Sequence, residues 1–166
     1  MIKIAIFGFG AVGQGVAEVL MRKKRLLEKL IGNYKVVAIT DSKSSIINEN
    51  GIDLSEALKV KREKGMLKSD KKTLDVIDSC EFNVAIEVTP TNIETGEPGL
   101  TYIKKSLKKG ANVITSNKGP LVVAYKELMR ICEKHNAKLL FEATVGGAMP
   151  IIKMVKRDLA GNEIYS

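Results

Sequence analysis

A lysine stands where an apolar run of the chain ends, in the segment ITSNKGP at residues 114–120. The run NVIT, at residues 112–115, has the composition of a buried strand, and Gly119-Pro120 is typical of the start of a helix. Ligands of open α/β sheets bind beyond the carboxyl ends of the strands. We therefore expect the ammonium of Lys118 to point into a cleft, where it can donate a hydrogen bond to a carbonyl oxygen of a substrate or cofactor. The alternative is a lysine in solvent beside a helix start.

A glycine motif follows the first apolar run of the chain. Residues 8–13 read GFGAVG, the pattern GxGxxG, between a strand-like segment and an apolar-periodic helix. This context is typical of dinucleotide-binding units, in which the three glycines allow a tight turn, a close approach of the pyrophosphate and close helix–strand packing. The amides of the first helical turn attract phosphate. The predicted phosphate site consists of Gly8, Phe9, Gly10, Ala11, Val12 and Gly13; a tight turn without a ligand is the alternative.

An acidic residue, Asp41, ends the second apolar run, KVVAITD. At this position a carboxylate typically binds the adenosine ribose hydroxyls of NAD. Asp41 lies 28 positions after Gly13, and a long helical region between these two residues can account for this spacing. An acid repels the 2′-phosphate of NADP, yet Lys43 could neutralise that phosphate, so the sequence leaves open whether the cofactor is NAD or NADP. An aspartate that only starts a turn before Ser42 is the alternative.

Apolar runs alternate with helical patterns along the chain. A helix is clearest at residues 120–135, where apolar residues recur at helical spacing, and another is indicated at Leu54–Lys64 within the polar region 42–72. Alternating strands and helices predict right-handed crossovers and a parallel sheet. We expect an α/β fold of the Rossmann type, doubly wound, with a mainly parallel sheet and helices on both faces. The predicted strands are Lys3–Phe7, Lys35–Thr40, Asn83–Val88, Asn112–Thr115 and Lys138–Phe141.

Length and composition narrow the class of protein. The chain has 166 residues, enough for one domain with its own core, and 45% of them are hydrophobic. No apolar run reaches the roughly 18–20 residues that span a bilayer, so we expect a cytoplasmic protein without a membrane partner. Cys80 and Cys132 show no metal-ligand spacing. The net charge of +8 comes from short clusters on predicted helices, and with no Trp present we expect no nucleic-acid partner.

Three motifs in the second half of the chain carry a family resemblance. The segments VTPTNIETGEP, VITSNKGPL and FEATVGGAMPII occur in this order, and with them the chain resembles homoserine dehydrogenases over essentially its whole length. The resemblance implies interconversion of homoserine and aspartate 4-semialdehyde with NAD(P), a step of threonine and methionine biosynthesis. It places Lys118 beside the nicotinamide and the substrate, in a positioning or proton-relay role. The other residues that it places around the nicotinamide are Thr89, Pro90, Thr115, Ser116 and Asn117.

The third motif also suggests an ion. Glycines let backbone carbonyl oxygens converge, and such oxygens together with a carboxylate suit a hard monovalent cation. The resemblance implies a sodium-like ion held by Glu142 and by the carbonyl oxygens of Val145, Gly147 and Met149. The alternative is a glycine-rich loop in which Glu142 accepts a backbone N–H, ahead of a helix that starts at Pro150.

The resemblance also implies what the chain does not contain. We expect residues 1–166 to form the NAD(P)-binding domain, with residues 150–166 starting the connection to a substrate domain, which in the family carries the acidic residues that hold the substrate amine and a second lysine. This chain is expected to bind dinucleotide but to turn over little homoserine by itself, and the intact enzyme is expected to be a homodimer. A stand-alone nucleotide-sensing module of a transporter is the alternative, because such modules have a similar length and also begin with a strand and GxGxxG.

Overall fold

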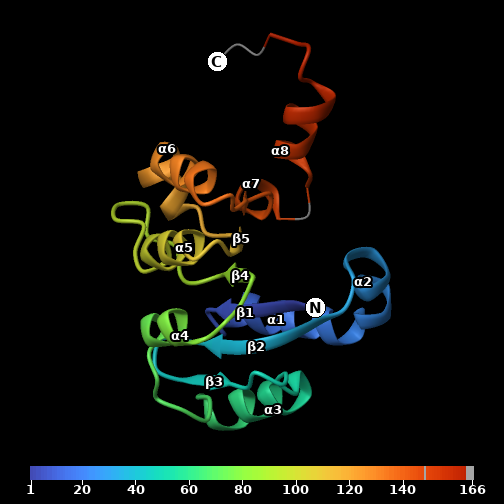
Figure 1. The fold of residues 1–166 in the computed structure, drawn as a ribbon, viewed down its shortest axis with the longest axis vertical. Helices are drawn as coiled ribbons and strands as arrows, with labels where there is room; N and C mark the ends of the chain where they lie inside the picture. Colours follow the sequence, from blue (N-terminus) through green and yellow to red (C-terminus); the bar gives the residue numbers. More distant parts are fainter. Residues whose placement is uncertain (148, 164–166) are drawn as a thin grey trace.

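The fold is a single sheet with helices packed on it (Figure 1). The computed structural model describes residues 1–147 and 149–163. Its six strands have the order β3-β2-β1-β4-β5-β6, and every neighbouring pair is parallel except β2 and β3. The strands are β1 (Ile2–Phe7), β2 (Tyr34–Thr40), β3 (Ser45–Ile47), β4 (Val84–Glu87), β5 (Asn112–Thr115) and β6 (Leu139–Leu140).

The helices pack in two groups on opposite faces of the sheet. One group is α1 and α3, and the other is α4, α5 and α6. Among residues 1–147 and 149–163, no helix is both long and apolar enough to cross a bilayer. The helices are α1 (Ala11–Arg22), α2 (Lys24–Ile31), α3 (Leu54–Lys64), α4 (Thr73–Ser79), α5 (Gly99–Lys108), α6 (Gly119–Lys134), α7 (Ala143–Gly146) and α8 (Ile151–Lys153), followed by one π-helical segment, η1 (Met154–Asp158).

Successive side chains of β1 point to opposite faces of the sheet, so the apolar core has two parts. Ile4 and Ile6 point into the core under α1 and α3, whereas Ala5 and Phe7 point into the core under α4, α5 and α6. This is the period of two expected of a strand covered on both faces. Phe7 is completely buried, and its ring makes edge contacts with the rings of Phe82 and Tyr102. The two cores together explain why nearly continuous apolar runs form the central strands.

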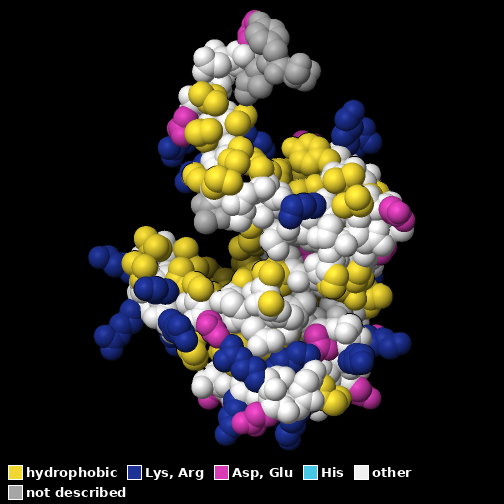
Figure 2. Space-filling view, turned by 180° about the vertical axis from the view of Figure 1, so that it is seen from behind, with side chains coloured by type: hydrophobic (Ala, Val, Ile, Leu, Met, Phe, Trp, Pro, Cys, Tyr) yellow, Lys and Arg dark blue, Asp and Glu magenta, His cyan; other side chains and the backbone are white. Residues whose placement is uncertain are grey.

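Helices do not cover the whole sheet. Ile114 of β5 is in register with Ile86 of β4 and with Leu140 of β6, so these three side chains share the face that α1 covers farther along the sheet. Ile86 is buried there, but Ile114 and Leu140 are 39% and 53% exposed. Other apolar side chains stay exposed on α2 and in the C-terminal segment, and the space-filling view shows a hollow in the surface between these two regions (Figure 2).

The predicted fold class is confirmed, with differences at the edges of the sheet. The helix Leu54–Lys64 is found at the predicted residues, and all five predicted strands are present, although the last one shortens to Leu139–Leu140. The prediction missed β3, which pairs antiparallel with β2 at the edge. Three residues are too few to show a period, so only pairing with β2 defines this strand. The helix expected from Pro150 is confined to Ile151–Lys153 before the chain continues into η1.

Removal of the Phe7 ring should destabilise the fold strongly. Phe7→Ala leaves a cavity between the sheet and α5, and such substitutions cost about 3–5 kcal/mol. Urea unfolding measures this loss. The control is Ile93→Ala, because Ile93 is 62% exposed and surface changes usually alter the free energy of unfolding by less than about 0.5 kcal/mol. Equal stability of the two variants would contradict this description of the core.

Candidate functional site

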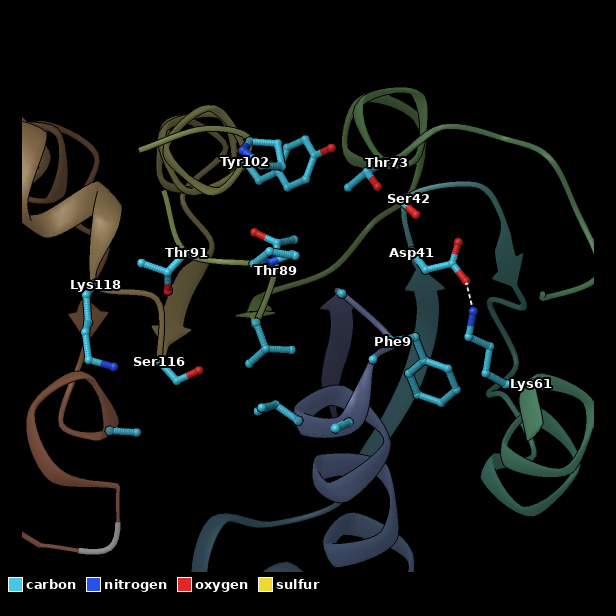
Figure 3. A pocket seen from close by; sticks show the side chains of 18 of the residues that line it. Phe9, Asp41, Ser42, Lys61, Thr73, Thr89, Thr91, Tyr102, Ser116 and Lys118 are labelled. Atoms are coloured by element: carbon cyan, nitrogen blue, oxygen red, sulfur yellow. Dashed lines mark hydrogen bonds and ion pairs between the residues drawn. The ribbon is translucent and has the colours of Figure 1, made fainter. Parts of the chain in front are cut away.

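A cavity of about 770 Å³ runs along the carboxyl ends of β1, β2, β4 and β5 (Figure 3). Its volume lies within the usual range for a small-molecule site. Asp41 and Lys61 line it at one end, and Ser116 and Lys118 at the other. The glycine turn after β1 lies between these two ends. The cavity therefore brings together residues that lie more than seventy positions apart, such as Asp41 and Lys118.

The turn between β1 and α1 requires glycine at two positions, because neither position has room for a side chain. Gly8 has φ +101°, and a Cβ atom on it would lie 2.6 Å from the carbonyl oxygen of Val88. A Cβ atom on Gly13 would lie 1.9 Å from the carbonyl oxygen of Gly8, so α1 starts directly against the end of β1. Only glycine tolerates such contacts, as the motif predicts.

The first turn of α1 faces the cavity with its backbone. Gly10, Ala11 and Val12 line the cavity, and a Cβ atom on Gly10 would meet only open space. Gly10 is the N-cap residue, and no side chain caps the helix there. The amides of a helical first turn carry partial positive charge and bind anions. This end of α1 can therefore accept a phosphate from the cavity.

Asp41 lines the cavity and also holds the turn that follows it. Its Oδ1 atom accepts hydrogen bonds from the amides of Lys43 and Ser44, both at 2.7 Å, and its Oδ2 atom accepts one from the Lys61 ammonium at 2.6 Å. Burial by itself would raise the pKa of the Asp41 carboxyl, but these bonds and those from the Ser44 hydroxyl outweigh burial and lower the pKa below its ordinary value. The turn that was the alternative interpretation is therefore present, and Asp41 also lines the cavity; the binding of ribose hydroxyls by Asp41 stays a prediction.

The cation beside the Asp41 carboxylate is Lys61, whereas the sequence analysis expected Lys43 in this role. Lys43 contributes its backbone amide to the turn and is not among the residues that line the cavity, whereas Lys61 reaches Asp41 from α3. Lys61 sits on the predicted helix, 20 positions after Asp41. The sequence held no signal for this pair, because the approach of α3 to the end of β2 depends on the packing of α1 and α3.

At the other end of the cavity, Lys118 immediately precedes α6. Its side chain is exposed and lines the same end of the cavity as that of Ser116 (Figure 3). Thr89 and Pro90 line the cavity from the loop after β4. The lining residues that the sequence analysis did not assign to the site include Ser42, Thr73, Thr91, Pro98 and Tyr102. Thr91 and Pro98 belong to the motif VTPTNIETGEP, whereas Thr73 and Tyr102 lie on α4 and α5, where no motif was identified.

Thr115 and Asn117 lie beneath the cavity. Both are 1% exposed and do not line it; their side chains bind the carboxylate of Glu87 instead. Glu87 is 0% exposed at the end of β4 and also accepts a hydrogen bond from the Thr89 amide at 2.8 Å. The sequence analysis missed Glu87, although an acid inside the apolar run NVAIEV was a visible signal.

In the loop proposed to hold an ion, the oxygen atoms accept hydrogen bonds from backbone amides of α8. Both carboxylate oxygens of Glu142 accept the Lys153 amide, at 3.2 and 3.1 Å, and the Met149 carbonyl accepts the Ile151 amide at 2.9 Å. Gly147 lines the cavity, and Val145 is 53% exposed. Within the described residues, no cluster of three or more His, Cys, Asp or Glu could hold a metal. The bond from Lys153 is the one expected if Glu142 only accepts a backbone N–H.

Comparison with known proteins decides the family. Residues 8–142 match the model described as "Homoserine dehydrogenase, NAD binding domain". The chain belongs to this family. It is 48% identical to a homoserine dehydrogenase of Methanocaldococcus jannaschii over 169 aligned positions, which cover 98% of this chain and 50% of that protein. The chain therefore spans about half the length of such relatives, and the family assignment makes it an NAD(P)-binding domain rather than a transporter module.

Solved structures agree with the family assignment. A putative homoserine dehydrogenase from Archaeoglobus fulgidus superposes with a TM-score of 0.89 at 51% identity, over 96% of this chain and 48% of that one. A hyperthermophilic archaeal homoserine dehydrogenase in complex with NADPH superposes with a TM-score of 0.81 at 30% identity, over 96% of this chain and 49% of that one. In both comparisons this chain matches about half of a longer chain.

A low pH should decrease the free energy of unfolding, because the Asp41 carboxylate becomes protonated. Because the folded-state pKa of Asp41 is lowered, its stabilising contribution is fully present above the unfolded-state value of about 3.9 and is lost as the pH falls through the folded-state value. The difference in free energy of unfolding between the natural chain and Asp41→Asn should be constant above about pH 5 and shrink below about pH 4. Urea unfolding at a series of pH values measures it. A difference that stays the same from pH 6 to pH 3 would contradict the assignment.

Proposed function

We propose that this chain holds the NAD(P) of a homoserine dehydrogenase along the cavity. The phosphates bind the first turn of α1, the adenosine ribose binds near Asp41, and the nicotinamide lies beside Lys118. The observation that carries this proposal is one continuous cavity, which includes the glycine turn, Asp41 and Lys118 at the carboxyl edge of the sheet. The family match supports the same placement.

The residues of this chain fit the chemistry of aldehyde reduction. When bound, a reduced nicotinamide supplies the hydride that converts an aldehyde to an alcohol. The developing alkoxide needs a nearby positive charge or a proton donor, and the ammonium of Lys118 can supply either one. We propose aspartate 4-semialdehyde and homoserine as the substrate pair of the intact enzyme. Relatives are about twice as long as this chain, so we propose that their remaining half supplies the substrate-binding acids and a second lysine.

The cofactor preference depends on the Asp41–Lys61 pair. Both side chains line the cavity beyond the carboxyl end of β2, where the adenosine ribose binds in folds of this type. The carboxylate accepts ribose hydroxyls and repels a 2′-phosphate, whereas the ammonium attracts that phosphate. The pair cancels its own charge, so we propose that the site accepts both NAD and NADP.

The sequence analysis also made predictions beyond the cofactor cavity. The sodium-like ion, the homodimer of the intact enzyme and the cytoplasmic location stay predictions. The same holds for residues 150–166 as the start of a connection to a substrate domain. Residues 164–166 lie outside the described residues.

Lys118→Ala should change the nicotinamide end of the bound cofactor. Titration of the chain with NADH, followed by nicotinamide fluorescence, should show altered emission and an affinity weaker by about tenfold, the effect of one lost hydrogen bond to a charged group. ADP-ribose, which lacks the nicotinamide, should bind as before. The control is Lys126→Ala, an exposed lysine on α6, the helix that Lys118 precedes. Emission and affinity unchanged by Lys118→Ala would contradict the proposed placement.

Asp41→Asn should shift the preference towards NADP. The variant removes the negative charge and frees Lys61 for a 2′-phosphate, so the ratio of NADP to NAD affinity should rise by about tenfold, as for one favourable charged contact. Calorimetric titration with each dinucleotide measures the ratio. Glu63→Gln, an equal change of charge at an exposed site on α3, is the control. A ratio that rises equally in both variants would mean that net charge alone governs the preference.

A further inference from the structure

Glu87 is a buried acid with an unusual set of partners. It is 0% exposed at the carboxyl end of β4, between β1 and β5. An ionised carboxylate only accepts hydrogen bonds, and burying one without partners costs several kcal/mol. Its oxygens accept four bonds, from the Thr89 amide at 2.8 Å, the Thr89 hydroxyl, the Thr115 hydroxyl at 2.7 Å and the Asn117 amide group at 3.3 Å. No lysine or arginine within the described residues forms an ion pair with it.

These bonds join the two loops that line the nicotinamide end of the cavity. Thr89 lies in the loop after β4, and Asn117 belongs to the loop after β5, directly before Lys118. The Thr115 hydroxyl accepts the Asn117 backbone amide at 2.9 Å, and the Asn117 side-chain oxygen accepts the Gly119 amide at 3.1 Å. The residues on both sides of Lys118 are therefore connected to Glu87 by one or two hydrogen bonds.

Close backbone contacts hold the same region from the other side. A Cβ atom on Gly99, the first residue of α5, would lie 2.6 Å from the side-chain nitrogen Nδ2 of Asn117 and 2.9 Å from the Oε1 atom of Glu87. The positive end of α5 thus lies against the carboxylate, which favours its negative charge. A Cβ atom on Gly119 would lie 2.1 Å from the carbonyl oxygen of Asn92, so the backbone after Lys118 packs on the loop after β4.

We propose that Glu87 is a positioning residue, which fixes the loops carrying Thr89 and Lys118 so that the lysine ammonium meets the nicotinamide end of a bound dinucleotide. The ligand part of this proposal rests on the proposed function; the fixing of the loops does not. A polar group that only fills the core would affect overall stability alone, whereas a positioning residue also affects the nicotinamide end and leaves the adenosine end unchanged.

The first test uses Glu87→Gln and needs no ligand. The glutamine oxygen can accept from Thr89 and Asn117, but its NH₂ group then faces the Thr115 hydroxyl, which loses its acceptor. Hydrogen exchange resolved by residue should show the amides of Thr89, Asn117 and Gly119 exchanging about fivefold faster, as expected for one lost hydrogen bond. Amides of β2 should keep their rates within about twofold.

The second test measures two ligands with the same variant. Glu87→Gln should raise the Kd for NADH by about fivefold and alter nicotinamide emission, while the Kd for ADP-ribose stays within about twofold. Glu81→Gln is the matched control, because the Glu81 side chain is 86% exposed and should change neither ligand. Thr115→Val, which keeps the shape and removes the hydroxyl, replaces Glu87→Gln if that variant does not fold. In Thr115→Val the Asn117 backbone amide loses its acceptor. The Kd for NADH should again rise while the Kd for ADP-ribose stays the same.

The outcomes separate this proposal from the proposed function. Unchanged exchange at the three loop amides overturns the positioning role, and so does an equal weakening of NADH and ADP-ribose. If the natural chain binds neither NADH nor NADPH, the proposed function fails, and the exchange measurement alone then decides whether Glu87 fixes the loops.

Discussion

The contact between the Gly8 carbonyl and Gly13 is the constraint on which the rest of the site depends. With no room for a Cβ atom at either position, α1 begins directly at the carboxyl end of β1. Its first amides therefore face the edge where β2, β4 and β5 also end. The cavity follows from this geometry, because parallel strands bring all their following loops to one edge of the sheet.

Charge is distributed unevenly along that cavity. At one end, Asp41 and Lys61 neutralise each other within a well-bonded turn. At the other end, Lys118 stands exposed above a buried acid, and no ion pair of the described residues includes it. The two ends thus suit different tasks. The paired end presents little net charge to a ligand, whereas the unpaired ammonium can meet negative charge on an oxygen atom of a ligand.

Much of the fold and part of the site could be predicted from short segments. The glycine motif, the apolar strands and the helix Leu54–Lys64 are local patterns, and each appears in the structure where the sequence places it. The three-residue β3 could not be predicted, because only its pairing with β2 makes it a strand. Thr115 and Asn117 were expected beside the cofactor, but their side chains turn inward to Glu87, a choice that the motif around Lys118 does not contain.

The sequence by itself determined which residues end the central strands, and so which loops must meet at the carboxyl edge of the sheet. Glycine positions and apolar periods are properties of neighbouring residues, and steric exclusion acts on them locally. The tertiary structure decided which distant side chains pair there: Lys61 with Asp41, and Glu87 with Thr115 and Asn117. Hydrogen bonds and ion pairs act only within a few ångströms, so these pairs exist only once packing has brought separate segments of the chain together.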